Sequence, residues 1–166
     1  MQAHAAQLEK KRDELKFRAA RAEIEDLLVA VDRGEIDMAY CDEAGFAQAH
    51  PNRSAWTLVG KCHASTAQRG KRLNVVGALL SSGELFAAKL WETMTAMLFV
   101  GFLSLLMAHV GKPLVVILDN ASVHKAKEIE PLLKVLQGKG LKLYFLPPYS
   151  PELNRIEKLW HKMKYE

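Results

Sequence analysis

Apolar and polar positions along the first half of the chain predict one helix followed by three short strands. Residues 5–33 lack Pro and Gly, and Ile24, Leu27 and Val31 recur at helical spacing before Gly34. Short apolar runs bounded by turn residues come next, a pattern that is typical of strands. These predicted strands cover 36–41, 56–60 and 73–80. We expect the three of them to form an antiparallel meander.

The second half of the chain alternates helices and strands. LVVIL at 114–118 is apolar at every position, as in a strand that is buried on both faces. Ser150 and Pro151 suit the N-cap and first position of a last helix. The other predicted elements are a helix over 93–109, a helix around 125–137 and a strand over 141–146. This succession predicts an α/β fold: a five-stranded mixed sheet, with three antiparallel strands then two parallel strands, and helices on both faces.

Composition and hydropathy give little support for a secreted or membrane protein. The most apolar stretch, 94–110, is 17 residues long and contains Ser104 and His109. It is at the short limit for crossing a bilayer, so a buried helix is the better interpretation. The N-terminus is charged where a signal peptide has its apolar core. Two cysteines, Cys41 and Cys62, are too few for a disulfide framework, so we expect reduced thiols and a cytoplasmic location.

The positive charge of the chain is local. The 166 residues include 23 Lys and Arg against 19 Asp and Glu, a net charge of +4. Residues 44–83 contain five basic residues and no acidic one, so the surplus arises in this segment alone. The five are Arg53, Lys61, Arg69, Lys71 and Arg72. A basic segment without acids is suited to a polyanion, and we expect it to hold the phosphate backbone of a nucleic acid.

Two aspartates follow apolar strands and are candidates for a metal site. Asp42 comes after the strand that ends in TyrCys, and Asp119 comes directly after VVIL. The ends of such strands are where open α/β sheets place their sites, and a carboxylate beside an apolar core needs a partner or an ion. The alternative for each is a turn cap, which explains Asp119 equally well because Asn120, Ala121 and Ser122 follow it.

Glu157 is the third candidate, on the predicted last helix. Leu153, Ile156, Trp160 and Met163 form one apolar stripe, and Glu157 lies at its edge, where it can face the sheet. An edge Glu paired with a nearby Lys is the alternative interpretation. Two Asp and one Glu are hard oxygen ligands that favour Mg²⁺ or Mn²⁺, because no His/Cys spacing here suits zinc or iron. Two such ions could clamp a phosphodiester.

Three strings in the sequence are similar to those of a known family. They are DEAGF at 42–46, LDNASVH at 118–124 and LPPYSPELNRIEKLWHKMK at 146–164, the last being highly specific. The chain resembles the catalytic domain of DDE transposases, in the bacterial insertion-sequence branch of the mariner superfamily, over roughly residues 36–164. The resemblance implies a ribonuclease H-like fold and Mg²⁺-dependent cleavage and joining of transposon-end DNA.

Carried over residue by residue, the resemblance implies that Asp42, Asp119 and Glu157 are the catalytic, metal-binding acids. Between Asp119 and Glu157 lie 37 residues, close to the family's interval of roughly thirty-five. Glu43 is excluded because strand alternation points it to the opposite face. Asn120 is a candidate for supporting the ligands, since its amide can bond to a carboxylate or a phosphate, although turn chemistry also explains it. His124 could lie near phosphate or metal, but a His at a helix start that is bonded to backbone explains it as well.

The family comparison also shapes the expected domain organisation and partners. We expect residues 1–35 to be a leading helix or linker and residues 36–166 to be the catalytic domain. We expect residues before 36 not to supply the family's N-terminal helix-turn-helix, and we expect the C-terminus to be short relative to the family. The expected partners are transposon ends and target DNA, bound by a homodimer on paired ends in the bacterial nucleoid. The alternatives are a truncated, catalytically silent DNA-binding or assembly remnant, and a ribonuclease H-like nuclease without strand transfer.

Overall fold

One mixed five-stranded sheet forms the centre of the computed structural model, which describes residues 12–47, 59 and 72–165. The strand order is β3-β2-β1-β4-β5, with β1–β2 and β2–β3 antiparallel and β1–β4 and β4–β5 parallel. The strands are β1 (Asp37–Ala47), β2 (Arg72–Leu80), β3 (Leu85–Leu90), β4 (Leu114–Leu118) and β5 (Leu141–Phe145). Three antiparallel strands followed by two parallel ones confirm the predicted sheet.

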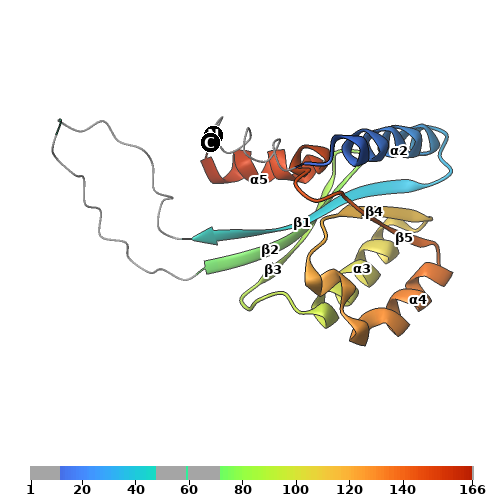
Figure 1. Ribbon diagram of the computed structural model, residues 1–166. Coiled ribbons are helices and arrows are strands. Elements are labelled where there is room, and N and C mark those ends of the chain that lie inside the picture. Colours follow the sequence, from blue (N-terminus) through green and yellow to red (C-terminus); the bar gives the residue numbers. More distant parts are fainter. Residues whose placement is uncertain (1–11, 48–58, 60–71, 166) are drawn as a thin grey trace.

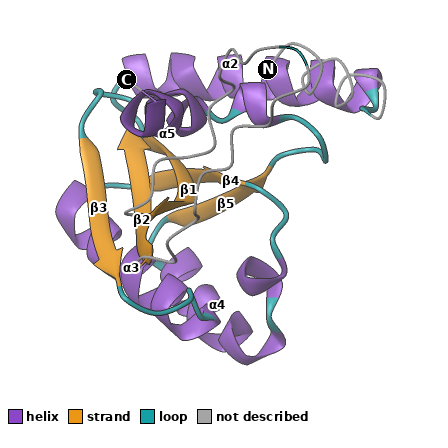
Figure 2. Cartoon of the chain, turned by 90° about the vertical axis from the view of Figure 1, so that its left-hand side faces the viewer, coloured by secondary structure: helices purple, strands orange, loops and turns teal. Residues whose placement is uncertain are grey.

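Helices cover both faces of this sheet, as predicted. Figure 1 shows α2 and α5 on one face and α3 and α4 on the other, and Figure 2 shows the same layers from the side. The helices are α2 (Glu14–Asp32), α3 (Ala96–Val110), α4 (Glu130–Gly138) and α5 (Arg155–Tyr165). Three short 3₁₀ turns, η1 (Ser122–Lys125), η2 (Lys127–Ile129) and η3 (Pro151–Leu153), lie in the connections.

The core consists of two apolar layers separated by the sheet. Successive residues of β1 alternate between them: Ala39 and Cys41 pack on the α3 side, and Met38 and Tyr40 pack on the α5 side. This is the period of two expected of a strand. Strand β4 is buried at all five positions, as predicted for LVVIL. Helix α2 contributes Ile24 to the α5-side layer, so it is packed onto the sheet.

Helix α3 is the apolar segment that the sequence predicts as a buried helix. The Thr95 side chain caps its start by accepting from the Leu98 N–H, and Gly111 ends it in the left-handed region at φ 69°. Phe99, Leu103 and Leu106 are buried against the sheet. Within the described residues, no helix combines the length and the apolar character that a bilayer crossing requires.

The third antiparallel strand is not the one predicted. The predicted strand at 56–60 lies outside the described residues, apart from Val59. In the structure β3 pairs antiparallel with β2, and the tight turn at Ser81–Glu84 connects the two strands. In this turn Gly83 has φ 90° and the Leu80 N–H donates to the Glu84 carbonyl. The sequence LFAAKL lacks β-branched residues, so propensity does not mark it as a strand, and its pairing with β2 decides the outcome.

The predicted start of the last helix is also corrected. Pro151–Leu153 forms a 3₁₀ turn, and α5 begins only at Arg155. Ser150 makes no side-chain capping bond; its hydroxyl donates to the Pro148 carbonyl at 3.4 Å. Ile156 and Trp160 of the predicted apolar stripe are buried, but Met163 is exposed. Helix α2 begins at Glu14, because the Asp13 side chain caps it by accepting from the N–H groups of Leu15 and Lys16; residues 5–11 of the predicted leading helix lie outside the described residues.

Candidate active site

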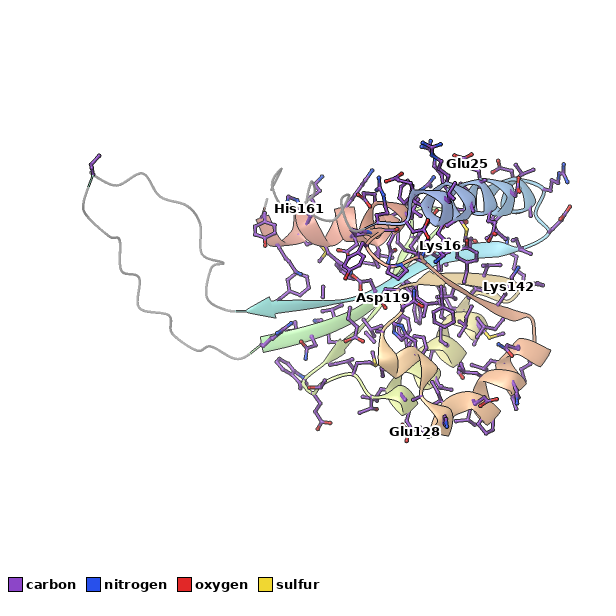
Figure 3. The ribbon with its side chains drawn as sticks, viewed as in Figure 1. Lys16, Glu25, Asp119, Glu128, Lys142 and His161 are labelled. Carbon is purple, nitrogen blue, oxygen red and sulfur yellow. The ribbon has the colours of Figure 1, made fainter. Side chains whose placement is uncertain are left out.

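Asp42 and Asp119 come from neighbouring parallel strands at the same edge of the sheet. The β1–β4 register pairs Asp37 with Leu114 and Tyr40 with Ile117, so its continuation brings Asp42 beside Asp119. Both follow residues that face the α3-side layer, Cys41 and Leu118, and alternation therefore directs both carboxylates toward α5. In Figure 3, Asp119 lies near the middle of the molecule.

Glu157 approaches the two aspartates from α5, and the three acids line one open pocket of about 410 Å³. We call it the acidic pocket. The loop between β5 and α5 forms most of the opposite wall with its prolines and Tyr149. The full lining is Asp42, Asp119, Asn120, Ala121, Leu146, Pro147, Pro148, Tyr149, Ser150, Pro151, Asn154 and Glu157.

Two carboxylates of the acidic pocket, those of Asp42 and Glu157, have raised pKa values. Burial, together with the charges of Glu157 and Asp119, raises the pKa of Asp42 to about 7. The pKa of Glu157 is raised by burial and by Asp119, against a lowering by Lys164. No ion pair within the described part of the chain joins Asp42 or Glu157 to a basic side chain. The pocket is therefore suited to a cation.

The three carboxylates are better suited to a divalent cation that keeps part of its water shell than to one enclosed by protein ligands alone. No three His, Cys, Asp or Glu side chains of the described residues are close enough together to hold one ion by themselves. Mg²⁺ commonly takes only one or two protein carboxylates and completes its shell with water and substrate phosphate oxygens. Three carboxylates around an open, solvent-accessible pocket match that requirement, whereas zinc sites are built mainly from His and Cys ligands.

The Asp119 carboxylate is held by two neighbours. Its Oδ1 accepts from the Ala121 N–H at 2.9 Å, so the turn cap that the sequence allowed is present. The same oxygen lies 3.3 Å from Nδ1 of His124, a side chain that is only 8% exposed. The His124 ring packs on Phe99, with the centroids 4.4 Å apart. The turn bond and the imidazole fix one oxygen of Asp119, whose side chain remains 60% exposed and accessible to a further ligand.

Asn120 links the ends of β4 and β5. Its side-chain amide donates to the Leu146 carbonyl, and the Leu146 N–H donates to the Leu118 carbonyl at 2.9 Å. Leu146 opens the loop that forms the wall of the acidic pocket. The structure therefore gives Asn120 a definite role in holding this wall beside Asp119.

Comparison with known families matches residues 37–166, which include all three acids, to one family described as DDE superfamily endonuclease. The chain belongs to the DDE superfamily endonuclease family. The match covers the whole sheet together with α3, α4 and α5. No curated protein sequence matches the chain.

Solved structures with the same fold include DNA-processing enzymes. The Mos1 mariner paired-end complex with Mn is 21% identical, with a TM-score of 0.59 over 93% of this chain and 49% of that one. The Mos1 transposase paired-end complex with the left transposon end is 21% identical, with a TM-score of 0.55 over 92% and 50%. A simian T-cell lymphotropic virus intasome chain is 16% identical, with a TM-score of 0.52 over 77% and 37%. The fold is the expected ribonuclease H-like fold, and the chain spans about half the length of the Mos1 chains it matches.

Of the basic residues that the sequence assigns to DNA binding, only one lies in the described part of this family member. Arg72 begins β2 and is exposed, and its guanidinium passes over Gly45 of β1, where a Cβ would collide with it. Arg53, Lys61, Arg69 and Lys71 lie outside the described residues. The structure thus places one of the five residues, at the ends of β1 and β2.

Two further contributors to the site, Asn154 and Gly77, were not singled out from the sequence. Asn154 is 4% exposed, lines the acidic pocket and donates to the Cys41 carbonyl at 3.2 Å. Gly77 pairs with Asp42 across the β1–β2 ladder. A glycine inside the apolar run VVGALL is a signal of close approach by another group, and a polar Asn between Leu153 and Ile156 is a signal that it has a buried partner.

Proposed function

We propose that the chain is the catalytic domain of a transposase that cuts DNA at transposon ends and joins the freed ends to target DNA. The observation that carries this proposal is the acidic pocket, where Asp42, Asp119 and Glu157 from three different elements meet in a DDE superfamily endonuclease fold. The transposon-end complexes among the similar structures support it. A homodimer acting on paired ends in the bacterial nucleoid is part of the proposal.

In this proposal Asp42, Asp119 and Glu157 hold two Mg²⁺ or Mn²⁺ ions. When bound, such ions lower the pKa of water and stabilise the attacking and leaving oxygens of a phosphoryl transfer. The Mos1 paired-end complex with Mn supports a divalent ion of this kind. The chain's own residues supply the position: His124 and the Ala121 N–H hold Oδ1 of Asp119, and Asn120 holds the loop across the pocket.

The reaction consists of two exchanges at phosphorus. In the first, a water oxygen bonds to phosphorus at the transposon end, the bond to the 3′-oxygen breaks, and that oxygen takes up a proton to give a 3′-hydroxyl and a 5′-phosphate. In the second, the 3′-hydroxyl bonds to a target phosphorus, and a target 3′-oxygen leaves with a proton. The basic residues of 44–83, including Arg72, bind the phosphate backbone in both steps.

The test uses a plasmid that carries the two inverted repeats bordering the coding sequence, incubated with the protein and Mg²⁺. We expect cleavage at the repeats that EDTA abolishes. Asp119→Asn keeps the side-chain volume but removes a ligand charge, so the rate should fall about 10³-fold, equivalent to several kcal/mol of transition-state stabilisation. Asp26→Asn, the same change at an exposed position of α2, should leave the rate unchanged.

The products separate the proposal from its alternatives. A labelled duplex with a free 3′-hydroxyl end should be joined to a second plasmid in the same buffer. Cleavage without joining would identify a nuclease that does not transfer strands. DNA binding without Mg²⁺-dependent cleavage would identify a silent binding module. Cleavage that persists in Asp119→Asn would remove Asp119 from the catalytic set.

A further inference from the structure

Two side chains, one from the residue just before α5 and one from α5 itself, reach the sheet on either side of Glu157. Asn154 lies three residues before it and Trp160 three residues after it, close to one helical turn in each direction. Each contacts backbone that is next to Asp42. Asn154 bonds to the carbonyl of Cys41, the preceding residue, and Trp160 packs over Gly77, the residue paired with Asp42 on β2.

Asn154 connects β1 to the first turn of α5. Its Nδ2 donates to the Cys41 carbonyl at 3.2 Å, and its own carbonyl accepts from the Glu157 N–H at 3.1 Å. The amide orientation follows from chemistry, because a carbonyl oxygen can only accept. Oδ1 of Asn154 is buried and has no partner among the described residues. The donor side of the amide is therefore the part that makes a specific contact.

Trp160 occupies space that only a glycine on β2 leaves open. A Cβ at Gly77 would lie 2.7 Å from Cη2 and Cζ2 of the indole and 3.2 Å from Cδ1 of Ile156. Trp160 is 2% exposed and also packs edge-on against Phe46, with the centroids 6.2 Å apart. Its Nε1 has no hydrogen-bond partner within the described chain, so the ring acts here through its shape.

A positioning role is needed at this place because the carboxylates repel one another. Asp42, Asp119 and Glu157 line the same pocket, and their ionised carboxylates carry the same charge. Such repulsion favours moving α5 away from β1. The Asn154 bond and the Trp160–Gly77 contact oppose that movement at both ends of the Glu157 turn.

We propose that Asn154 and Trp160 are positioning residues that hold the Glu157 carboxylate at a fixed distance from Asp42. Gly77 contributes by leaving the space in which the Trp160 indole packs. The inference rests on the proposed metal-dependent function. It implies that small changes at Gly77 or Asn154, none of which alters an acid, weaken divalent cation binding. Outer contacts of this kind commonly change metal affinity or activity by about 10- to 100-fold.

The first experiment measures Mn²⁺ affinity by electron paramagnetic resonance, without DNA, for Gly77→Ala. The added methyl group should push the indole and α5 outward and weaken Mn²⁺ binding about 10- to 100-fold. Adding Trp160→Phe should restore most of the affinity, because Phe lacks the outer ring atoms that meet the methyl group and no hydrogen bond is lost. Gly101→Ala is the matched control, since a Cβ there has no neighbour within 4 Å.

The second experiment removes the other contact with Asn154→Ala. Its matched control is Asn74→Ala, because Nδ2 of Asn74 donates to the Glu92 carbonyl at 3.1 Å, a similar bond away from the acids. We expect Asn154→Ala alone to weaken Mn²⁺ binding about 10-fold or more. In the cleavage assay it should lower kcat and leave KM for DNA unchanged, since the phosphate-binding residues are elsewhere.

The outcomes separate this inference from the proposed function. Wild-type protein that binds Mn²⁺ but cuts no DNA would contradict the function, while the affinities of the variants would still decide the positioning roles. Gly77→Ala or Asn154→Ala protein with a native circular dichroism spectrum and wild-type Mn²⁺ affinity would overturn the inference. The inference would also be overturned if Gly77→Ala weakened Mn²⁺ binding and the added Trp160→Phe substitution did not restore it. Wild-type protein that binds no Mn²⁺ would overturn both.

Discussion

The two faces of the sheet are built from the same strands, but they carry different residues where the strands end. On the α3 face the apolar layer is continuous, with Val116 and Leu118 of β4 packed against Leu103 and Leu106. On the α5 face the layer formed by residues such as Met38 and Ile117 gives way to carboxylates at the strand ends. The α3 face is organised for stability. The α5 face leaves a pocket where charge can remain hydrated and reach a ligand.

The difference has an energetic consequence. A fully buried apolar side chain stabilises the fold, whereas the partly buried, like-charged carboxylates of the acidic pocket destabilise it until a cation or a proton neutralises them. The raised pKa values of Asp42 and Glu157 are the direct sign of this cost. Truncating a buried apolar residue and neutralising a pocket carboxylate should therefore change stability in opposite directions.

The largest effect on stability is expected on the α3 face. Leu103 is 0% exposed, and Leu103→Ala should lower the free energy of unfolding by about 2–5 kcal/mol through lost burial and a residual cavity. Urea unfolding in EDTA measures this change. Leu105→Ala, at a 63% exposed position of the same helix, is the control and should change stability little. Equal losses at both positions would contradict the distinction between the buried and exposed sides of α3.

A smaller effect of opposite sign is expected from Asp42→Asn. The pKa of Asp42 is about 7 in the fold against an ordinary 3.8, so the folded state holds the proton more tightly than the unfolded state. The stabilisation that protonated Asp42 gives to the folded state is fully present below about pH 4 and is lost as the pH rises to about 7. The metal-free wild type should lose up to about 4 kcal/mol over this range, and Asp42→Asn should lose less.

Urea unfolding at pH 5 and pH 8 in EDTA checks this pH dependence. Adding Mg²⁺ at pH 8 should restore stability to the wild type by mass action and should do so much less in Asp42→Asn. Parallel pH dependences for the two proteins would show that Asp42 does not carry the electrostatic cost of the α5 face.

The smallest effect is expected at the rim of the sheet, at Arg72. If its guanidinium neutralises one phosphate, Arg72→Ala should reduce the slope of log affinity against log salt concentration by about 0.9. Fluorescence anisotropy with a labelled duplex at several salt concentrations measures that slope. Lys139→Ala, an exposed lysine after α4 and remote from the acidic pocket, should leave the slope unchanged. The same reduction in both variants would indicate a diffuse charge effect.

Local sequence was sufficient for the elements whose own residues carry a strong signal. LVVIL is apolar throughout and forms β4 at the predicted positions, and the apolar α3 ends at Gly111 as the sequence indicates. Strand β3 was missed because LFAAKL owes its structure to pairing with β2. The start of α5 was placed too early, because Pro151 opens a separate 3₁₀ turn instead of the helix.

By itself, the sequence determined the fold class, the positions of Asp42 and Asp119 after apolar strands, and Glu157 at the edge of an apolar stripe. Only the tertiary structure decided that the three acids share one pocket, since this depends on the parallel β1–β4 register and on how α5 docks. Likewise, the Asn154 and Gly77 contacts join residues far apart in the chain. Periodicity reports which face of an element is apolar, but it holds no information about which distant backbone that face will meet.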